Sequence, residues 1–543
     1  RTNEVRSQAS KQNSVQSDTR LTWNQRFGAH KVDLLGGIRI NWENYTRNSQ
    51  WGYDTGSDKT PYISSSLKNA SSSGDNDTWR NMDVYLQGNY NYAGRYYLQA
   101  NLTGSGSSRF GKKADGGIKF GGVKWGIFPS VQATWVLSNE AWLAGMNELS
   151  WLDKLSLTAG YDVSGNDGIG YNASRTYFAG SLFLNRAAGL TLEGIANEEV
   201  KWETTSRFNV GVDAGLFNNR VKVGASIFFS KTQDLLTLQT LPYYSGLETY
   251  WTNDGELENR GFDVSASVKL LSTRNWSWEM GATIGHYENK INKLASGVDS
   301  YTTELYSGTV LTKVGKAANL FYGYKTDGVF ASTAEANADA LFIKDNTGAN
   351  LYFGAGDMRF VDQDGNHEIN EDDRVVIGNP NPDIYGNIFT TASYKHFHLN
   401  VNFKYSLGND VYNYMRSQLE GGSRFMNQTK ALTNRWQYEG QETSVPKATF
   451  QDPMGNSRFS DRWIEDGSYL KLKSVTLSYD LPLNLTFLQG LQFWVQANNL
   501  FTATKYLGSD PEVSCTNAVI GQGIDAGCLG GSRSFMAGVK INL

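Results

Sequence analysis

The stretch that decides the fold is NPNPDIYGNIFTTASYKHFHLNVNFKYSLGND, residues 379–410. Its second half alternates apolar and polar residues, and the apolar set is Phe397, Leu399, Val401, Phe403, Tyr405 and Leu407. Residues 384–394 form a similar run, and a short link at Lys395 joins the two. Because successive side chains of a strand point to opposite faces, the pair is predicted to be a hairpin with one apolar and one polar face. Strands of about ten residues exceed the usual length in soluble sheets and are typical of a sheet whose apolar side meets lipid.

The same alternating unit recurs along the chain and predicts about 16 strands. Besides the opening hairpin, the candidates lie near residues 21–27, 31–42, 82–92, 96–102, 122–137, 155–163, 176–186, 208–216, 221–229, 262–270, 276–284, 470–481, 491–497 and 535–543. In the strand near 470–481 the alternation slips at Lys473 and Ser474, which indicates a β-bulge. Residues 1–17 are polar and are expected to form a turn or a frayed lead-in.

The connections between these strands fall into two classes. Some are about two to five residues long, whereas those at 43–78, 231–257, 291–378, 408–468 and 502–531 are long, polar and aromatic. Short periplasmic turns and long extracellular loops are the known asymmetry of outer-membrane barrels. We therefore expect an all-β protein, a transmembrane antiparallel β-barrel, rather than a soluble sandwich or propeller with shorter strands.

Composition narrows the class further. No run of 18 or more apolar residues occurs among the 543 residues, so the sequence predicts no transmembrane helix. A net charge of −4 gives no support for a nucleic-acid partner. The chain opens without Met and without an apolar signal region, which suggests a mature fragment or the later part of a longer precursor.

The two cysteines, Cys515 and Cys528, lie close together near the C-terminus. An even pair within one loop favours a local disulfide in an oxidising compartment, and two free thiols are the alternative.

One compact acidic segment, DQDGNHEINEDD at 362–373, resembles a calcium-binding loop. Its candidate ligands, at positions 1, 3, 5, 7 and 12, are Asp362, Asp364, Asn366, Glu368 (through its carbonyl) and Asp373. Two departures weaken the pattern: His367 stands where glycine normally makes the sharp turn, and position 12 is Asp rather than the longer Glu. The alternative is a solvated acidic loop without a metal.

Aromatic residues suggest two different roles. Those on strands, such as Tyr90, Tyr92, Trp276, Trp278 and Phe397, are expected to form a girdle at the membrane interface. Those in the long loops could stack on sugar rings or simply pack; they are Trp51, Tyr53, Tyr62, Tyr243, Tyr244, Tyr250 and Trp251.

Catalytic patterns are missing from the sequence. It holds no nucleophile elbow, Walker loop or Cys/His zinc spacing, and we expect no enzyme. The pair His396 and His398 is interpreted as part of the polar strand face, because the sequence supplies no further metal ligands beside it.

Several segments together resemble the SusC-like branch of the TonB-dependent outer-membrane transporters. They include YLQANLTGSGSSRFG (97–111), WGIFPSVQATWVLSNEAWL (125–143), GELENRGFDVSASVKLL (255–271), GDMRFVDQDGNHEINEDDRVVIGNPNPDIYGNIF (356–389) and QANNLFTATKYLGSDPEV (496–513). The resemblance is spread over nearly the whole length, with order and spacing preserved.

This resemblance implies a barrel of about 22 strands, closed by an N-terminal plug domain. Residues 1–543 would then be the C-terminal portion of the barrel, and we expect a companion N-terminal piece with the plug and the first strands. The family imports oligosaccharides, or peptides in some members, with energy from the TonB complex and with a SusD-like surface lipoprotein as partner. It requires no cofactor, and its location is the outer membrane of a Gram-negative bacterium.

Active glycan import is therefore the function that the sequence favours. The alternatives are a peptide importer of the same family, a passive porin-like barrel of about 16 strands, and a soluble extracellular glycan-binding β protein. The identity of the substrate does not follow from the sequence.

Overall fold

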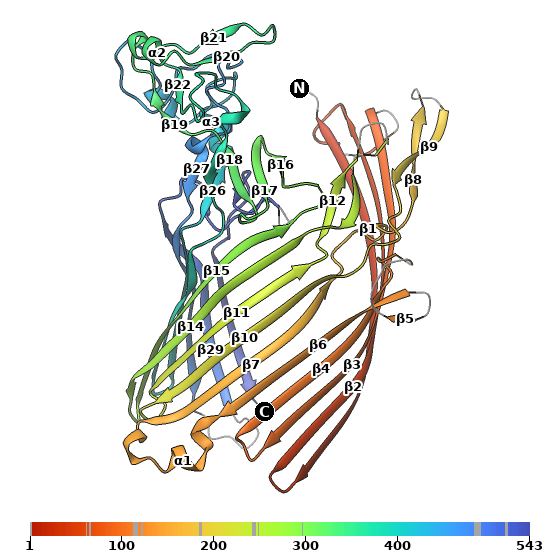
Figure 1. The fold of residues 1–543 in the computed structure, drawn as a ribbon, viewed down its shortest axis with the longest axis vertical. Coiled ribbons are helices and arrows are strands. Elements are labelled where there is room, and N and C mark those ends of the chain that lie inside the picture. Colours follow the sequence, from red (N-terminus) through yellow and green to blue (C-terminus); the bar gives the residue numbers. More distant parts are fainter. Residues whose placement is uncertain are drawn as a thin grey trace. The chain divides into compact units, whose positions relative to one another are not determined.

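The computed structural model describes residues 3–542 except 61, 65–66, 112–117, 121–122, 184–186, 242–245, 248, 296, 483–489 and 516–519. Its main feature is a sheet of sixteen strands (Figure 1). The strand order is β1-β2-β3-β4-β6-β7-β10-β11-β14-β15-β24-β25-β28-β29-β31, with β5 paired to β6. The described neighbours are antiparallel, as in β1–β2 and β24–β25. The prediction of an all-β, antiparallel fold is confirmed.

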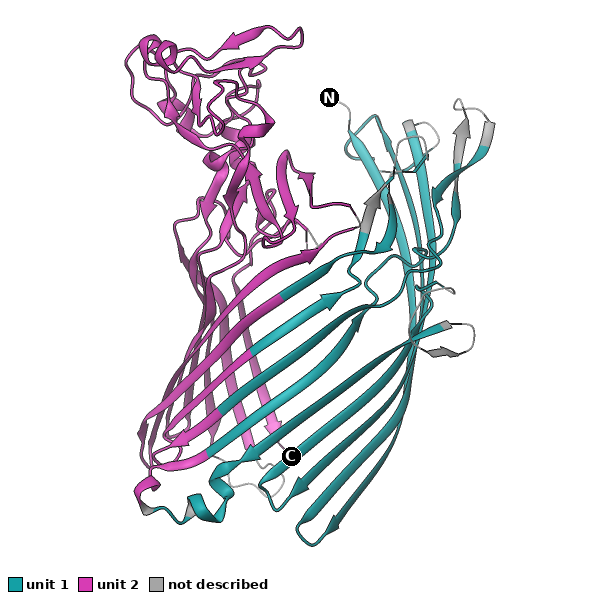
Figure 2. Ribbon diagram, in the orientation of Figure 1, with its two compact units in different colours: residues 1–147, 155–212, 228–258 teal, residues 148–154, 213–227, 259–543 magenta. Residues whose placement is uncertain are grey.

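The chain divides into two compact units (Figure 2). Unit 1 comprises residues 1–147, 155–212 and 228–258. Its strands are β1 (Glu4–Phe27), β2 (His30–Tyr53), β3 (Lys68–Tyr92), β4 (Tyr96–Ser107), β5 (Ile118–Phe120), β6 (Val123–Val136), β8 (Tyr177–Phe183), β9 (Ala187–Gly194), β12 (Leu236–Thr240) and β13 (Thr249–Asn253), and its helical turns are η1 (Leu137–Asn139) and α1 (Ala141–Ala144). Strands β7 (Leu152–Asn166), β10 (Glu203–Leu216), β11 (Val221–Gln233) and β14 (Glu256–Ser272) contribute residues to both units, as does η2 (Asn147–Leu149).

Unit 2 comprises residues 148–154, 213–227 and 259–543. Its long sheet strands are β15 (Trp276–Lys293), β24 (Ile384–Tyr394), β25 (Phe397–Leu407), β28 (Tyr469–Leu481), β29 (Gly490–Thr504) and β31 (Ser534–Asn542). Its connections contain β16 (Ser300–Leu305), β17 (Gly308–Lys313), β18 (Leu320–Gly323), β19 (Thr326–Val329), β20 (Phe342–Lys344), β21 (Asn350–Tyr352), β22 (Met358–Phe360), β23 (Val375–Gly378), β26 (Asp410–Asn413), β27 (Ile464–Asp466) and β30 (Ile524–Asp525). The helices there are α2 (Thr333–Asp339), α3 (Tyr414–Glu420), η4 (Glu371–Asp373), η5 (Lys430–Asn434) and η6 (Asp461–Trp463).

The register of the opening hairpin keeps apolar side chains in rows across neighbouring strands of unit 2. Leu399 of β25 faces Ala392 of β24 and Leu477 of β28, and the row continues through Val495 of β29 to Ala537 of β31. All of these side chains except the half-buried Ala392 are exposed, with 44% of Leu477 and 53% of Val495 accessible. The opposite parity carries polar residues, so this part of the sheet has the predicted unlike faces.

The predicted β-bulge in β28 is present. The pairing of β28 with β29 shifts between Leu472 and Ser474, and its pairing with β25 shifts between Asn402 and Phe403. Relative to β25, the extra residue is Lys473, which restores the apolar row after the slip in the sequence pattern. Relative to β28, the extra residue lies in β29, between Asn498 and Phe501.

Two sequence expectations about strand limits are wrong. Strand β1 starts at Glu4, inside the expected polar lead-in, and β2 and β3 run far into the connection expected at 43–78. Their added parts are rich in Ser, Asn and Asp on both faces, so backbone pairing continues where no apolar period marks it. The candidate strand near 176–186 is confirmed as β8, although it pairs with β9 in a two-stranded sheet apart from the large one.

Aromatic rings gather where the short turns join the strands. In unit 1, His30 and Tyr92 lie 4.8 Å apart between ring centroids; in unit 2, Trp276 lies 4.3 Å from Tyr394 and Phe397 lies 4.6 Å from Tyr479. Most of these rings are exposed, Trp276 at 48%. Their position fits the expected girdle at a membrane interface.

The long connections of unit 2 are folded structures rather than open loops. Those between β15 and β24 and between β25 and β28 fold together at one end of the strands (Figure 1). One buried cluster includes Phe330 and Phe360, and a second includes Tyr412, Trp463 and Ile524. The buried apolar side chains of this unit thus lie mainly in the connections. The apolar side chains of the sheet are mostly exposed. Among the described residues, no helix is long and apolar enough to span a membrane.

Candidate functional site

The acidic segment predicted from the sequence lies between β22 and β23, in the folded connections of unit 2. One carboxylate oxygen from each of Asp362, Asp364 and Asp373 lies within 4.8 Å of the others. Residues eleven positions apart therefore converge on one point, as the spacing predicts. Mutual repulsion of three carboxylates at this separation favours a cation between them.

The backbone of the segment wraps around Asp362. Its two carboxylate oxygens accept hydrogen bonds of 2.8 Å from the N–H groups of Gly365 and His367. His367 has φ of +64°, the left-handed conformation that glycine normally supplies at this position of a calcium loop. The departure from glycine therefore leaves the turn intact, and the ring is held by a 2.9 Å contact between its Nδ1 and the carbonyl of Asp339.

The other two predicted ligands are arranged differently. The Asn366 side chain donates to Asp364 Oδ2 at 2.8 Å, and its oxygen accepts from the N–H of Glu368 at 2.6 Å. Asn366 thus lies beside the carboxylate group and presents its amide oxygen to the backbone. The carboxylate of Glu368 is outside the cluster, and the predicted contribution of this residue is its main-chain carbonyl.

The C-terminal end of the segment is held in place by buried residues. Asp373 is fully buried and accepts from the N–H groups of Gln363 at 2.7 Å and Asn370 at 2.9 Å. Ile369 is 3% exposed and packs in the cluster with Phe330 and Phe360, while its N–H donates to the carbonyl of Phe342 at 2.8 Å. The carboxylates are therefore held on a rigid base, which lowers the cost of ordering them around an ion.

Electrostatics differ among the three carboxylates. Burial raises the pKa of Asp364, and the nearby charges of Asp373 and Asp362 raise it further. Burial also acts to raise the pKa of Asp362, but the N–H groups of His367 and Gly365 outweigh it and the pKa is lowered. A bound divalent cation would relieve the repulsion that raises the pKa of Asp364.

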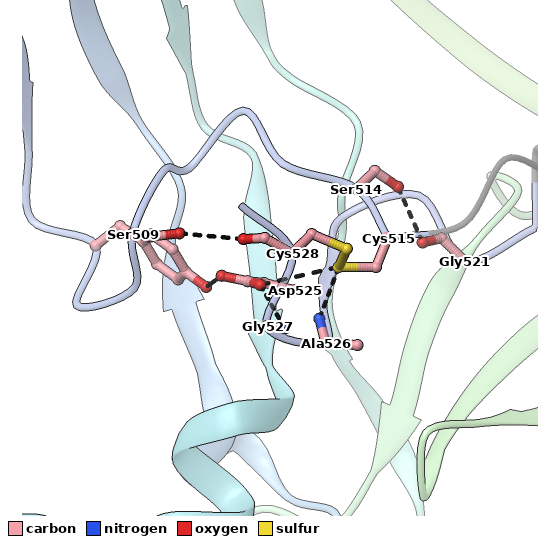
Figure 3. Close-up of a disulfide and its surroundings, with 9 residues drawn as sticks. Ser509, Ser514, Cys515, Gly521, Asp525, Ala526, Gly527 and Cys528 are labelled. Atoms are coloured by element: carbon pink, nitrogen blue, oxygen red, sulfur yellow. Dashed lines mark hydrogen bonds between the residues drawn. A yellow bond between two sulfur atoms is a disulfide. The ribbon is translucent and has the colours of Figure 1, made fainter. Parts of the chain in front are cut away.

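Cys515 and Cys528 are joined by a disulfide with a Cα–Cα distance of 5.8 Å (Figure 3). The loop it closes contains β30, which pairs in parallel with β26. The Ala526 N–H lies 3.0 Å from Cys515 Sγ, and Tyr506 donates to Asp525 at 2.8 Å. The bond thus holds a segment whose Ile524 is fully buried.

A buried charged cluster that the sequence reasoning missed joins the same C-terminal connection to the sheet. Lys471 of β28, 2% exposed, donates to Asp510 at 2.9 Å and to Glu512 at 2.6 Å, and Lys404 of β25 also pairs with Glu512. Burial raises the pKa of Glu512, but the two lysines outweigh it and lower the value to about 2. The polar parity of Lys404 and Lys471 was visible in the sequence, but their distant partners were not.

Of the remaining sequence candidates, His398 and Trp251 have structural contacts. His398 lies between Ser393 and Asp480, at 2.9 and 2.8 Å, on three neighbouring strands, which fits the interpretation as polar strand-face residues. Trp251 packs against the buried cluster around Val200. Tyr62 is 74% exposed. Tyr243 and Tyr244 lie outside the described residues.

Comparison with protein families gives one match over most of the chain. The family model described as TonB dependent receptor-like, beta-barrel, matches residues 1–414. The chain is 30% identical over 550 residues to TonB-dependent receptor P3 of Formosa agariphila, covering 97% of this chain and 52% of that protein. It is 27% identical over 478 residues to TonB-dependent receptor SusC of Bacteroides thetaiotaomicron, covering 83% of this chain and 43% of that protein. The chain thus spans about half the length of the curated relatives it matches.

Among solved structures, the RagAB peptide transporter shares the fold. The match has a TM-score of 0.77 at 24% sequence identity and covers 99% of this chain and 56% of that chain. A second RagAB structure, of the peptide importer in the 'closed-closed' state, gives a TM-score of 0.76 at 23% identity, again with 56% of that chain covered.

Proposed function

Because the chain belongs to the TonB-dependent receptor β-barrel family, we propose that it is part of an active importer of oligosaccharides. Proteins of this family reside in the outer membrane of Gram-negative bacteria, and so does this chain. The sheet would form part of the wall of the conduit, and the imported molecule would pass without chemical conversion. An N-terminal piece of the same transporter would supply the plug and the contact with the TonB complex.

The observation that best supports transport across a membrane is the unlike character of the two sheet faces. The outward row through Leu399, Leu477 and Val495 leaves apolar side chains exposed on β25, β28 and β29. In water, so large an apolar surface would be unfavourable, whereas lipid covers it. The opposite face carries polar and charged groups such as His398, Lys404 and Asp480, which suit a wet lumen.

The oligosaccharide and the SusD-like lipoprotein are the finer parts of the proposal. They rest on the resemblance of the sequence to the SusC-like branch. The RagAB neighbour is a peptide transporter, but its likeness to this chain concerns the fold. A peptide is therefore the alternative substrate that the test must separate from a glycan.

Uptake by cells tests this function. A strain without the transporter should lose uptake of fluorescently labelled oligosaccharides, and the gene for the complete protein should restore it. Removal of TonB should abolish the restored uptake, because a passive barrel would not need it. Unchanged oligosaccharide uptake in the deletion strain, or loss of peptide uptake alone, would contradict the proposal.

We further propose that the acidic segment binds one Ca²⁺ ion through Asp362, Asp364, Asn366, the carbonyl of Glu368 and Asp373. The support is the convergence of the carboxylates of Asp362, Asp364 and Asp373, held in place by the burial of Asp373 and Ile369. Hard oxygen ligands at this spacing suit Ca²⁺ better than a transition metal. Titration calorimetry of the chelator-treated full-length transporter should give one Ca²⁺ per chain, and none after Asp362→Ala with Asp364→Ala. A wild-type protein that takes up no Ca²⁺ would leave the segment a solvated acidic loop.

A further inference from the structure

A small polar cavity lies in the folded connections of unit 2, apart from the acidic segment. It has a volume of about 150 Å³ and is open to solvent on one side. Its surface is mainly polar, with Gln418, Ser423 and Arg424 among the lining residues. Tyr412, Phe459 and Trp463 also border it, but these three side chains are buried and form the packed base beneath it. A water molecule occupies roughly 30 Å³ in the liquid, so the cavity has room for only a few water molecules. It can therefore take one ring-sized group but not an oligomer.

The base of the cavity is rigid. Trp463 is fully buried and Tyr412 is 1% exposed, and both belong to one packed cluster. The Trp463 indole donates to the carbonyl of Arg458 at 3.1 Å, and the Tyr412 hydroxyl donates to that of Tyr306 at 3.0 Å. A ligand would therefore meet a preformed surface, which reduces the entropy cost of binding.

The rim carries polar groups that are free to bind a ligand. Within the described part of the chain, the side chains of Gln418, Ser423 and Arg424 make no hydrogen bond or ion pair with the protein. The neighbouring carboxylates are already engaged: Glu420 pairs with Arg416 at 2.9 Å, and Asp452 accepts from Ser457 at 2.6 Å. The charge of Arg424 is therefore available to an anionic group, and a guanidinium binds a carboxylate through two parallel hydrogen bonds.

Two exposed phenylalanines extend this site outward. Phe425 follows Arg424 and is 92% exposed, and its ring stacks on that of Phe450, 58% exposed, with centroids 4.8 Å apart. The N–H of Gln451 donates to the carbonyl of Ser423 at 3.0 Å and so holds the two segments together. A stacked aromatic pair exposed to water beside a polar cavity offers an apolar face to a second ring of the ligand, outside the cavity.

We propose that this cavity binds a carboxylated sugar residue of the imported glycan, with its carboxylate on Arg424 and the adjoining sugar ring on Phe425 and Phe450. Hydroxyl and amide groups of Ser423 and Gln418 match the hydroxyls of a pyranose, and the exposed rings of Phe425 and Phe450 match the apolar face of the adjoining sugar. The single guanidinium suits one carboxylate, which it binds through two parallel hydrogen bonds. This inference deepens the proposed function and rests on it.

Binding by the purified full-length transporter tests the proposal, with titration calorimetry as the readout. The probes are a tetragalacturonate, the same tetrasaccharide with its carboxyls reduced, and a tetrapeptide with a free carboxyl terminus. Wild-type protein should bind the acidic tetrasaccharide roughly tenfold to hundredfold more tightly than the reduced one. Arg424→Gln should remove this preference. Lys430→Gln, the matched control, removes one exposed positive charge from the same connection and should keep it.

Variants of Phe450 test the contribution of the stacked pair Phe425 and Phe450. Phe450→Leu should weaken binding of both tetrasaccharides by roughly threefold to tenfold, whereas Phe450→Trp should retain it. Arg424 and Phe450 are exposed, so none of these variants should lower the thermal unfolding temperature.

Three outcomes would overturn the proposal: no binding of the acidic tetrasaccharide by wild-type protein, binding that Arg424→Gln leaves unchanged, or an Arg424-dependent affinity for the tetrapeptide alone. The uptake assay separates these failures from failure of the import function. Cells whose oligosaccharide uptake needs the transporter but not Arg424 would refute this site and leave import standing.

Discussion

At the scale of single residues, the acidic segment shows what spacing alone can predict. The positions of Asp362, Asp364 and Asp373 indicated a shared centre, and the structure brings their carboxylates within 4.8 Å of one another. In the sequence, His367 is a departure from the calcium-loop pattern, which has glycine at this position. The identity of the residue does not reveal that this histidine adopts a φ of +64°. The backbone hydrogen bonds to Asp362 and the packing of Ile369 impose that conformation.

The first prediction concerns these carboxylates. Asp362→Ala with Asp364→Ala should lower the unfolding temperature of the connections more in Ca²⁺ than in chelator. Both states lose the backbone hydrogen bonds to Asp362, but only the metal-bound state also loses its ligands. At a Ca²⁺ concentration 100 times the Kd, the lost stabilisation would be about 2.7 kcal/mol. Differential scanning calorimetry of the full-length protein measures it.

Asp345→Ala is the matched control, since Asp345 accepts hydrogen bonds within a nearby turn but lies outside the cluster. Its effect should be the same with and without Ca²⁺. An equal loss in chelator for the double variant would speak against the metal.

The second prediction concerns the buried Lys471. Lys471→Met should destabilise the C-terminal connection by about 3–5 kcal/mol, because Asp510 loses its cation and Glu512 keeps only Lys404. Denaturant unfolding at neutral pH measures the loss. Lys473→Met, an exposed lysine on the same strand, should change stability little; a similar loss there would show that the ion pairs are not the cause.

The pH dependence follows from Glu512. Its folded pKa of about 2 lies below the ordinary value of 4.5, so its stabilisation is complete above pH 4.5 and is lost as the pH falls toward 2. Lys471→Met should flatten this part of the stability profile. A wild-type profile that is already flat between these values would contradict the pairing.

At the scale of elements, the strands differ in how much of them the sequence reveals. The hairpin β24–β25 and the bulge at Lys473 followed from alternation, because one face of these strands is apolar. The ends of β1, β2 and β3 did not, because both faces of those segments are polar. Pairing there is stabilised by backbone hydrogen bonds, which leave no period in the sequence.

The third prediction concerns the disulfide loop. Replacing Cys515 and Cys528 by Ala should cost about 3 kcal/mol, since the bond limits the freedom of a short loop in the unfolded chain. Limited proteolysis should then cut the segment around residues 506–531 faster. Reductant should reproduce this effect in the wild type and add nothing in the variant; cleavage that is equally fast in both proteins without reductant would refute it.

At the scale of the whole molecule, the distribution of apolar residues is the reverse of that in a water-soluble sheet protein. Fully buried Trp463 and Phe330 belong to the connections of unit 2, while Val495 and Phe493 of the sheet are exposed. Each unit can be understood by itself in these terms: a sheet face that needs lipid, and connections that have cores of their own.

The fourth prediction tests the lipid-facing row. Val495→Arg should destabilise the full-length protein in lipid vesicles by about 2–4 kcal/mol, because a charge on that face enters hydrocarbon. Gln496→Arg, on the next residue and the opposite face, should cost far less. Urea unfolding measures both; equal costs would mean that the two faces have been assigned wrongly.

The sequence by itself determined the all-β class, the unlike faces of the strands, the position of the bulge and the family resemblance. Each of these leaves a local period or spacing in the chain, because the side chains of a strand alternate between two environments. Only the tertiary structure decided which distant residues meet: Lys471 with Asp510, Trp463 with Tyr412, and Phe425 with Phe450. Such contacts depend on how the long connections fold, and no regular spacing of apolar residues in the sequence marks that fold.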